Sequence, residues 1–223
     1  MVYFVDVLEL RPVLPDLFAF PPNRATLGGT AYLILGTQGN LLVDCPAWSP
    51  ERAAALADRG GVAWLLLTHR DAMAQVAAFQ KALGCQVLVQ EQEAYLLPGV
   101  DCQTFGSAWT ELPQMTALWT PGYSPGSSCF YWGESGGVLF TGRHLLPDTQ
   151  GTLRPLHHRK TFHWGRQVQS VVRLQEHFAA APLAWMCPGA NSGFLRGRYA
   201  LDRAAERLAD LDPQRLMGQG VGV

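Results

Sequence analysis

The chain has 223 residues, of which 48% are hydrophobic and 16% are charged, and its formal net charge at pH 7 is −1. A chain of this length and composition can bury a large core, and its low charge fraction argues against intrinsic disorder. The near-zero net charge gives no reason to expect a nucleic acid as partner.

Apolar segments alternate with helix signals in the first ninety residues. The segments that we expect to form strands are residues 2–10, 30–35, 40–44, 62–67 and 86–90. Helices are expected at residues 49–59 and 71–83. Ser49 caps the first helix, Pro50 takes its first position, and Gly84 ends the second helix. The resulting β-β-α-β-α-β order is typical of a layered α/β protein.

The rest of the chain is predicted to be rich in strands. We expect these strands at residues 100–104, 116–119, 128–132, 137–141 and 183–187. Helices are expected at residues 165–178 and 198–211, and residues 147–160 form a long loop that is a candidate lid. Two β-rich halves with flanking helices predict two packed sheets with helices on both outer faces, in one domain of residues 1–215. A flexible, glycine-rich tail at residues 216–223 is expected to follow.

The sequence also carries indications of the cellular compartment. The longest apolar run, residues 62–67, is far shorter than the roughly 20 residues that span a bilayer. Met1–Asp6 lacks the basic start and the long apolar stretch of a signal peptide. The cysteines stand at positions 45, 85, 102, 129 and 187. Their odd number and the lack of a CxxC pair indicate free thiols in a reducing compartment, so we predict a cytoplasmic protein.

Five segments, in order, resemble motifs of the metallo-β-lactamase fold superfamily. They are Leu42–Pro46, Leu66–Asp71, Thr120–Ser127, Val138–Arg143 and Met186–Asn191. In the family these segments correspond to a strand that ends in an acid, the H-x-H-x-D-H motif, a T-P-G-H-T-P-G-S turn, a strand that ends in G-D, and an L-P-G-H-G turn. The resemblance implies an α/β (α+β) fold, a four-layer αββα sandwich. Thr141–Leu145, followed by Trp164, Gln167 and Ser170, also resembles hydrolase-like proteins of photosynthetic organisms.

The resemblance implies a metal site from which most ligands are missing. In this family, His and Asp side chains hold one or two metal ions, usually zinc and sometimes iron or manganese, which activate water. The positions of this chain that match those ligands are His69, Asp71, Met73, Ala74, Tyr123, Arg143 and Ala190. Only His69 keeps its identity and Asp71 could still ligate, whereas a catalytic zinc needs about three protein ligands. No metal is therefore expected at these vestigial positions.

Arg143 places a permanent cation where a metal ion would sit. We therefore hypothesise that Arg143 replaces the metal electrostatically and pairs with Asp71, with Asp44 as a second possible partner. Such a pair would compensate a buried carboxylate. The residues predicted to bind a ligand are Asp44, His69, Arg70, Asp71, Tyr123 and Arg143. The candidates for a catalytic role are His69, Asp71, Arg143 and His144.

Several groups allow both a functional and a structural interpretation. Arg70, Arg143 and His144 either form a cationic pocket for a carboxylate or phosphate or only compensate charge. Cys45 and Cys187, expected to face the site, are either nucleophiles that His69 activates or small buried thiols. Histidines at positions 157, 158 and 163 either bind a metal or lie in a solvated loop. The aromatic residues that either line a pocket or pack in the core are Trp109, Trp119, Tyr123, Tyr131 and Trp132.

The leading functional hypothesis is a catalytically degenerate protein, a pseudoenzyme, that binds a small molecule or a protein partner. The alternative is a metal-dependent hydrolase of thioesterase or glyoxalase type, with zinc or iron at an unorthodox site around His69, Asp71 and His144. A third possibility is a redox-linked module, for which the sequence shows no flavin or iron–sulfur motif. The ligand and partner are unidentified, neither a nucleic acid nor a membrane span is expected, and a homo-oligomer is possible.

Overall fold

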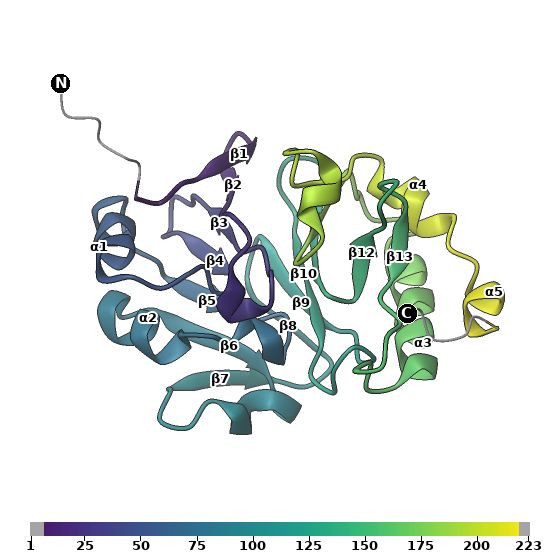
Figure 1. Cartoon of the computed structure of the whole chain (residues 1–223), viewed down its shortest axis with the longest axis horizontal. Helices are drawn as coiled ribbons and strands as arrows, with labels where there is room; N and C mark the ends of the chain where they lie inside the picture. Colours follow the sequence, from purple (N-terminus) through teal and green to yellow (C-terminus); the bar gives the residue numbers. More distant parts are fainter. Residues whose placement is uncertain (1–6, 219–223) are drawn as a thin grey trace.

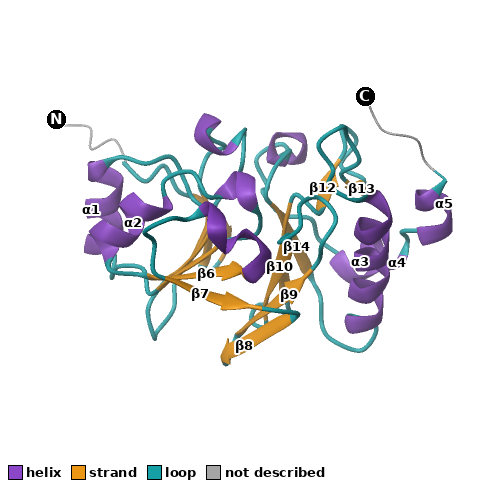
Figure 2. Cartoon of the chain, turned by 90° about the horizontal axis from the view of Figure 1, so that it is seen from below, coloured by secondary structure: helices purple, strands orange, loops and turns teal. Residues whose placement is uncertain are grey.

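Two β-sheets lie face to face, and helices cover the outer face of each, so the chain forms four layers (Figure 1 and Figure 2). The computed structural model describes residues 7–218. The arrangement confirms the αββα sandwich that the sequence predicts. Within residues 7–218, no helix is both long and apolar enough to cross a membrane.

The N-terminal half forms a seven-stranded sheet in which each strand lies beside the next one in sequence. Its strands are β1 (Arg11–Leu14), β2 (Leu17–Ala19), β3 (Tyr32–Ile34), β4 (Leu41–Val43), β5 (Trp64–Leu66), β6 (Gln86–Gln90) and β7 (Cys102–Phe105). Strands β1 to β4 pair antiparallel, and β4 to β7 pair parallel. Parallel neighbours require a crossover connection, which helices α1 (Pro50–Asp58) and α2 (Val76–Leu83) provide after β4 and β5.

The C-terminal half forms a five-stranded sheet. In spatial order its strands are β14 (Trp185–Pro188), β11 (Val138–Gly142), β10 (Ser128–Trp132), β9 (Met115–Trp119) and β8 (Ala108–Leu112). A separate hairpin pairs β12 (Leu145–Pro147) with β13 (Leu153–Pro155). The helices on the outer side are α3 (Trp164–His177), α4 (Ala204–Ala209) and α5 (Pro213–Met217). Short 3-10 helices connect other elements: η1 (Arg24–Thr26), η2 (Arg70–Ala72), η3 (Glu91–Leu96) and η4 (Ser192–Leu195).

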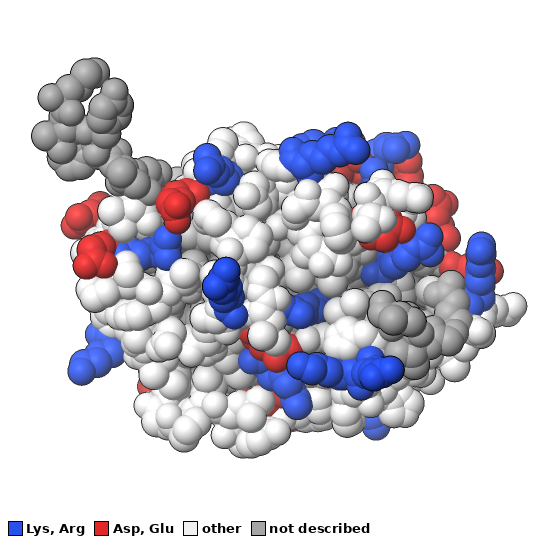
Figure 3. Space-filling model, viewed as in Figure 1, with Lys and Arg blue, Asp and Glu red and all other residues white. Residues whose placement is uncertain are grey.

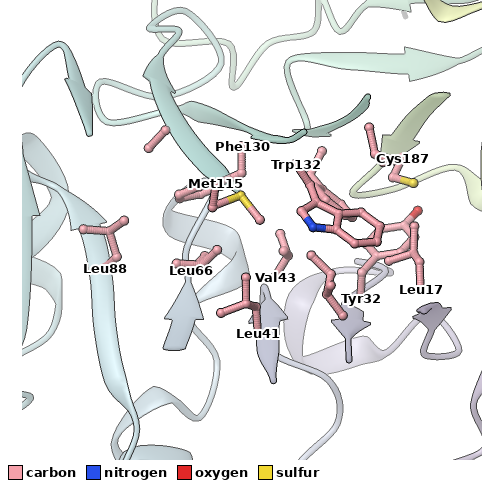
Figure 4. Packing of buried hydrophobic residues seen from close by; sticks show 14 of the residues in the cluster. Leu17, Tyr32, Leu41, Val43, Leu66, Leu88, Met115, Phe130, Trp132 and Cys187 are labelled. Carbon is pink, nitrogen blue, oxygen red and sulfur yellow. The ribbon is translucent and has the colours of Figure 1, made fainter. Parts of the chain in front are cut away.

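Every second residue of the strands packs into the core between the two sheets (Figure 4). In β4, the side chains of Leu41 and Val43 enter this core, whereas Leu42 packs on the opposite face against α1 and α2. In β10, Phe130 and Trp132 likewise enter the core between the sheets. Because successive side chains of a strand point to opposite faces, strands that are covered on both faces read as continuous apolar runs.

Local sequence signals predicted several elements correctly. β3 and β4 form the expected antiparallel hairpin. Helix α1 begins at Pro50, and the Ser49 hydroxyl accepts a hydrogen bond from the backbone N–H of Arg52 at 3.1 Å. Gly84 adopts a left-handed φ of 64° and ends α2. These elements depend on contacts between residues that are close in sequence, which is why the sequence alone reveals them.

Other predicted boundaries are wrong. Residues 7–10 do not form the predicted strand, whose residues 2–6 lie outside the described part of the chain. The helix predicted at residues 198–211 shortens to α4, because Arg203 has a left-handed φ of 49° immediately before it. The predicted loop at residues 147–160 contains β13.

Three further elements differ from the prediction. Helix α2 begins at Val76 instead of Asp71, because residues 70–72 form the separate helix η2. Strand β8, whose side chains are mostly exposed, was not predicted. Helix α5 was not predicted either; it buries Leu216 and ends at Met217, inside the segment predicted as a tail.

Gly122 allows the turn after β9 to pack directly against α3. A Cβ atom at this position would lie 2.2 Å from the Cβ atom of Gln167, and the φ of Gly122 is +153°. We predict that Gly122→Ala lowers the free energy of unfolding by about 1–3 kcal/mol, because the turn and the helix must separate. Urea unfolding measures this change.

Gly106→Ala is the matched control, because a Cβ atom there would meet no other atom within 4 Å. Its expected effect on the free energy of unfolding is below about 0.5 kcal/mol. Similar losses of stability in both variants would contradict the close packing of Gly122 against α3.

Candidate functional site

Loops that follow strands of both sheets meet at one edge of the sandwich. They carry Asp44 after β4, His69 and Asp71 after β5, Tyr123 after β9 and Arg143 after β11. The ring centroids of His69 and Tyr123 are 5.2 Å apart. The guanidinium carbon of Arg143 lies 5.9 Å from the centroid of the Tyr123 ring. The structure therefore brings together residues that are up to a hundred positions apart in the sequence.

Asp44 is buried, and Thr68 engages its carboxylate. Oδ1 accepts a hydrogen bond from the backbone N–H of Thr68 at 2.8 Å, and the Thr68 hydroxyl lies 2.9 Å from Oδ1 and 2.7 Å from Oδ2. Burial raises the pKa of Asp44 to about 7, although the Thr68 hydrogen bonds and the charge of Arg143 act to lower it. Asp44 thus stabilises the start of the loop that carries His69.

His69 is buried, with 3% of its surface exposed. Neither of its ring nitrogens has a hydrogen-bond partner among the described residues. Burial, and after it the charge of Arg143, lowers the pKa of His69 to about 3, so the ring is neutral. Gly142 makes room for this loop: a Cβ atom there would lie 2.5 Å from Oγ1 of Thr68 and 3.3 Å from Cδ2 of His69.

Asp71 and Tyr123 form a hydrogen bond across the edge of the sandwich. The Tyr123 hydroxyl donates to Oδ2 of Asp71. Burial, and after it this hydrogen bond, raises the pKa of Tyr123 above its ordinary value. The phenol therefore stays protonated, and one carboxylate oxygen of Asp71 is engaged.

Arg143 is held by backbone carbonyl groups instead of by a carboxylate. Its Nη2 atom donates to the carbonyl oxygens of Thr26 at 3.0 Å and Leu27 at 2.7 Å. Within residues 7–218, no acidic oxygen lies within 4.0 Å of the Arg143 guanidinium nitrogens. The predicted ion pair of Arg143 with Asp71 or Asp44 is therefore wrong. The physical reason is competition, because each carboxylate already accepts hydrogen bonds from a nearer hydroxyl group.

A pocket of about 410 Å³ opens beside Arg143. Arg143 and His158 are the ionisable residues in its lining, and Ala190 lies there at a vestigial ligand position. Leu27, Leu146, Leu156 and the segment of residues 190–193 form most of the remaining wall. The pocket therefore has a mainly uncharged wall with one permanent cation.

Arg70 and His144 do not line this pocket. Nε of Arg70 donates to Oε1 of Glu93 at 2.8 Å, and the Glu93 side chain is fully buried. The His144 ring is buried, and burial together with the nearby Arg173 lowers its pKa to about 3. The predicted cationic pocket of Arg70, Arg143 and His144 is therefore wrong for Arg70 and His144. Arg70 pairs with Glu93, and burial keeps His144 neutral.

Cys45 and Cys187 do not face the site, contrary to the prediction. Cys187 packs in the core between the sheets, and Cys45 packs in the layer beneath α1 and α2. Burial raises the pKa of both thiols above their ordinary value. Both thiols therefore stay protonated, which supports the structural interpretation of these residues.

The aromatic residues are mostly core residues. Trp109 and Trp132 pack between the sheets, and Tyr131 packs against Phe178 at a centroid distance of 5.2 Å. The Trp119 indole donates to the carbonyl oxygen of Pro125 at 2.8 Å. Of the aromatic residues proposed to line a pocket, Tyr123 alone contacts both His69 and Arg143 within the described chain.

The three loop histidines have separate local partners. His157 stacks on Trp164 with ring centroids 3.9 Å apart. Nδ1 of His158 accepts a hydrogen bond from the backbone N–H of Lys160 at 2.8 Å. Nδ1 of His163 accepts one from the first turn of α3. They therefore do not converge on one point, and of the three only His158 lines the pocket.

Several residues that hydrogen-bond to the site residues or to their loops were not among the predicted site residues. Thr68 and Glu93 engage Asp44 and Arg70, as described above. On α3, Nε2 of Gln167 donates to the carbonyl oxygen of His144 at 3.0 Å, next to Arg143. The Ser170 hydroxyl donates to the carbonyl oxygen of Pro121 at 2.9 Å, close to Tyr123. The only sequence signal for Gln167 and Ser170 was their place in the resemblance, which named them without a role.

The residues at the vestigial ligand positions do not fit a metal ion. Arg143 is permanently cationic, and Ala190 has no donor atom. The Tyr123 hydroxyl is a protonated donor to Asp71. His69 and Asp71 remain, fewer than the three protein ligands of a catalytic zinc. Within residues 7–218, no three His, Cys, Asp or Glu residues are grouped so that they could hold a metal ion.

Comparison with known proteins gives one curated relative. The chain is 31% identical over 146 residues to a hydroxyacylglutathione hydrolase from Cereibacter sphaeroides, a match that covers 64% of this chain and 53% of the relative. The chain therefore spans about half the length of this curated relative. No family model matches the chain.

Solved structures share the fold of this chain. A protein solved in a di-iron-bound form has a TM-score of 0.63 and 22% identity, covering 84% of this chain and 96% of the other. A motif mutant of a metallo-β-lactamase from Cronobacter sakazakii has a TM-score of 0.62 and 15% identity, covering 93% and 94% of the two chains. At these identities the likeness establishes the fold alone.

The neutral, buried state of His144 predicts a dependence of stability on pH. Its pKa is about 3 in the folded chain and about 6.5 when solvated. Unfolding therefore takes up a proton between these pH values, so the free energy of unfolding falls as pH is lowered from 6.5 toward 3. Replacing His144 with Gln should reduce this slope by about 1.4 kcal/mol per pH unit.

Urea unfolding of the wild type and His144→Gln, at several pH values between 4 and 6.5, measures the difference in slope. The raised pKa of Asp44 acts in the opposite direction, because the folded chain then holds a proton that the unfolded chain has released. This contribution is present in both proteins and cancels in the comparison. Identical slopes would show that His144 is not buried in its neutral form.

Proposed function

The chain has the metallo-β-lactamase fold, and on that premise we propose that its cleft binds a small carboxylate-bearing molecule without a resident metal ion. The observation that supports this function is the position of Arg143. Its guanidinium lines a pocket of about 410 Å³ and has no carboxylate partner among the described residues. The protein then belongs to the catalytically degenerate type, with a binding role in place of hydrolysis.

Arg143 supplies the charge that a carboxylate requires. A guanidinium is always charged near neutral pH and presents several N–H donors in a planar fork that matches a carboxylate. Two backbone carbonyl groups hold Nη2 of Arg143, whereas Nη1 donates to no acceptor within the described chain. The side chain is thus fixed in direction while it retains donor capacity for a ligand.

The rest of the pocket favours a ligand with an uncharged portion. Leu27, Leu146 and Leu156 lie in its wall, and Leu27 is 58% exposed. His158 shares the wall, and burial, followed by the charge of Arg143, lowers its pKa. Because a neutral imidazole can donate or accept one hydrogen bond per nitrogen, His158 adds directional polar contact without a second full charge.

A metal-dependent hydrolase is the second candidate function. It is favoured by the 31% identity to a hydroxyacylglutathione hydrolase. A hydroxyacylglutathione carries carboxylates on its glutathione portion, so such a compound also suits the Arg143 pocket. The vestigial ligand positions oppose this candidate, because Arg143 repels a divalent cation and Ala190 offers no ligand. A hydroxyacylglutathione is therefore a useful probe for both functions.

We predict that Arg143→Gln weakens the binding of glutathione or a hydroxyacylglutathione by about tenfold or more, because the charged contact to the carboxylate is lost. Isothermal titration calorimetry measures the dissociation constant. Arg59→Gln is the matched control, since Arg59 is exposed at the end of α1 and does not line the pocket. Equal affinities of the wild type and Arg143→Gln, or no binding at all, would contradict the proposed function.

Metal analysis separates the two candidate functions. We predict substoichiometric zinc and iron after the purified protein is incubated with either ion and dialysed. The triple variant Asp71→His/Tyr123→His/Arg143→Asp should retain metal under the same conditions. Together with His69, it has the family's metal-ligating residue at four positions. Stoichiometric metal in the wild type, together with hydrolysis of a hydroxyacylglutathione, would replace the binding function with the hydrolase.

A further inference from the structure

A second pocket lies on the C-terminal half, outside the cleft. Its volume is about 380 Å³, and its walls come from the turn at residues 149–152 and from residues 194–207. It shares no lining residue with the pocket beside Arg143. The ionisable groups that line it are Arg196, Arg198, Arg207 and Asp202.

Positive charge exceeds negative charge in this pocket by two. Arg207 is tied to Asp202, with Nε donating to its carbonyl oxygen at 2.7 Å and Nη2 donating to Oδ1 at 3.0 Å. This hydrogen bond is the main cause of the lowered pKa of Asp202, to which the charges of Arg207, Arg203 and Arg198 also contribute. The only acidic group in the lining is therefore already engaged by one arginine.

Arg196 and Arg198 keep their donors free. Both are exposed, and neither forms a salt bridge or a side-chain hydrogen bond with the rest of the described chain. In Figure 3, Lys and Arg side chains lie over the segments beside α4, at the upper right of the view, with Asp and Glu side chains next to them. A concave surface with an excess of one sign of charge concentrates the electrostatic potential and attracts a ligand of opposite sign.

Several residues of this segment, Arg196 among them, have an uncommon backbone conformation. Arg196 has a left-handed φ of 52°, and Asn191, Tyr199 and Arg203 in the same segment also have positive φ values. Non-glycine residues rarely have a positive φ, because this conformation costs free energy. Such residues cluster at ligand-binding segments. Here the left-handed turns place Arg196 and Arg198 on the same pocket wall, two residues apart.

We propose that this pocket is a binding site for the phosphate groups of a small phosphorylated molecule. Guanidinium groups bind phosphate through paired N–H donors, and several of them suit an anion that carries two or more charges. The opposite wall supplies the uncharged polar residues Thr149, Gln150 and Thr152, and Phe194 adds an aromatic surface that is 43% exposed. The site is independent of the cleft and of the function proposed for it.

Pyrophosphate and inorganic phosphate are the probes, titrated into the purified chain by calorimetry at low and at moderate salt. We expect pyrophosphate to bind more tightly than phosphate, and both to weaken as salt screens the charges. The double variant Arg196→Gln/Arg198→Gln should weaken pyrophosphate binding by about tenfold or more. Arg203→Gln is the matched control, because Arg203 lies on the same segment, is exposed and pairs with Glu206 at 3.5 Å instead of lining the pocket.

Arg143→Gln distinguishes this site from the cleft and should leave pyrophosphate affinity unchanged. Thermal unfolding of each variant without ligand verifies that the fold is retained, and the exposed position of Arg196 and Arg198 predicts little change. The proposal is overturned if pyrophosphate does not bind the wild type. It is also overturned if Arg203→Gln or Arg143→Gln weakens binding as much as the double variant does.

Discussion

The hydrogen bond from Tyr123 to Asp71 connects the two sheets at the mouth of the sandwich, and the rest of the site depends on it. Asp71 lies on a loop of the seven-stranded sheet, and Tyr123 lies on a loop of the five-stranded sheet. The bond engages the carboxylate and sets the phenol ring near His69, 5.2 Å away between centroids. It also keeps the phenol protonated, since burial and this bond both raise the pKa of Tyr123. Two positions that could offer ligands to a cation thus satisfy each other instead.

Arg143 takes its position as a consequence of this arrangement. Asp71 is engaged by Tyr123 and Asp44 by Thr68, so the guanidinium turns to the carbonyl oxygens of Thr26 and Leu27. Carbonyl groups orient a cation without neutralising it, and the charge therefore remains available to a ligand. In the proposed function, this fixed side-chain cation takes the place of a bound metal ion.

The sequence predicted the layers of the fold better than the contacts of the site. The β3–β4 hairpin and the Ser49 cap of α1 follow from neighbouring residues, and both were identified correctly. The predicted Arg143–Asp71 pair failed because the competing hydroxyl of Tyr123 is 52 residues from Asp71 in sequence. Gln167 illustrates the same limit, since its role depends on how α3 packs against two distant turns. The left-handed Arg203 moves the start of the helix predicted at residues 198–211 to Ala204, and no proline or glycine at that position signals the change.

The net charge of −1 does not describe the charge at the two pockets, where arginines outnumber acidic residues. Asp44, Asp71 and Asp202 each accept a hydrogen bond from a neighbouring side chain. Three of the arginines that line the two pockets, Arg143, Arg196 and Arg198, form no ion pair with a described carboxylate. Attraction of an anion to a pocket depends on the local excess of positive charge and not on the total charge. The reason is that screening limits the electric field of each charge to about 8 Å at physiological salt. A nearly neutral chain can therefore hold local excesses of positive charge, as at the two proposed anion sites.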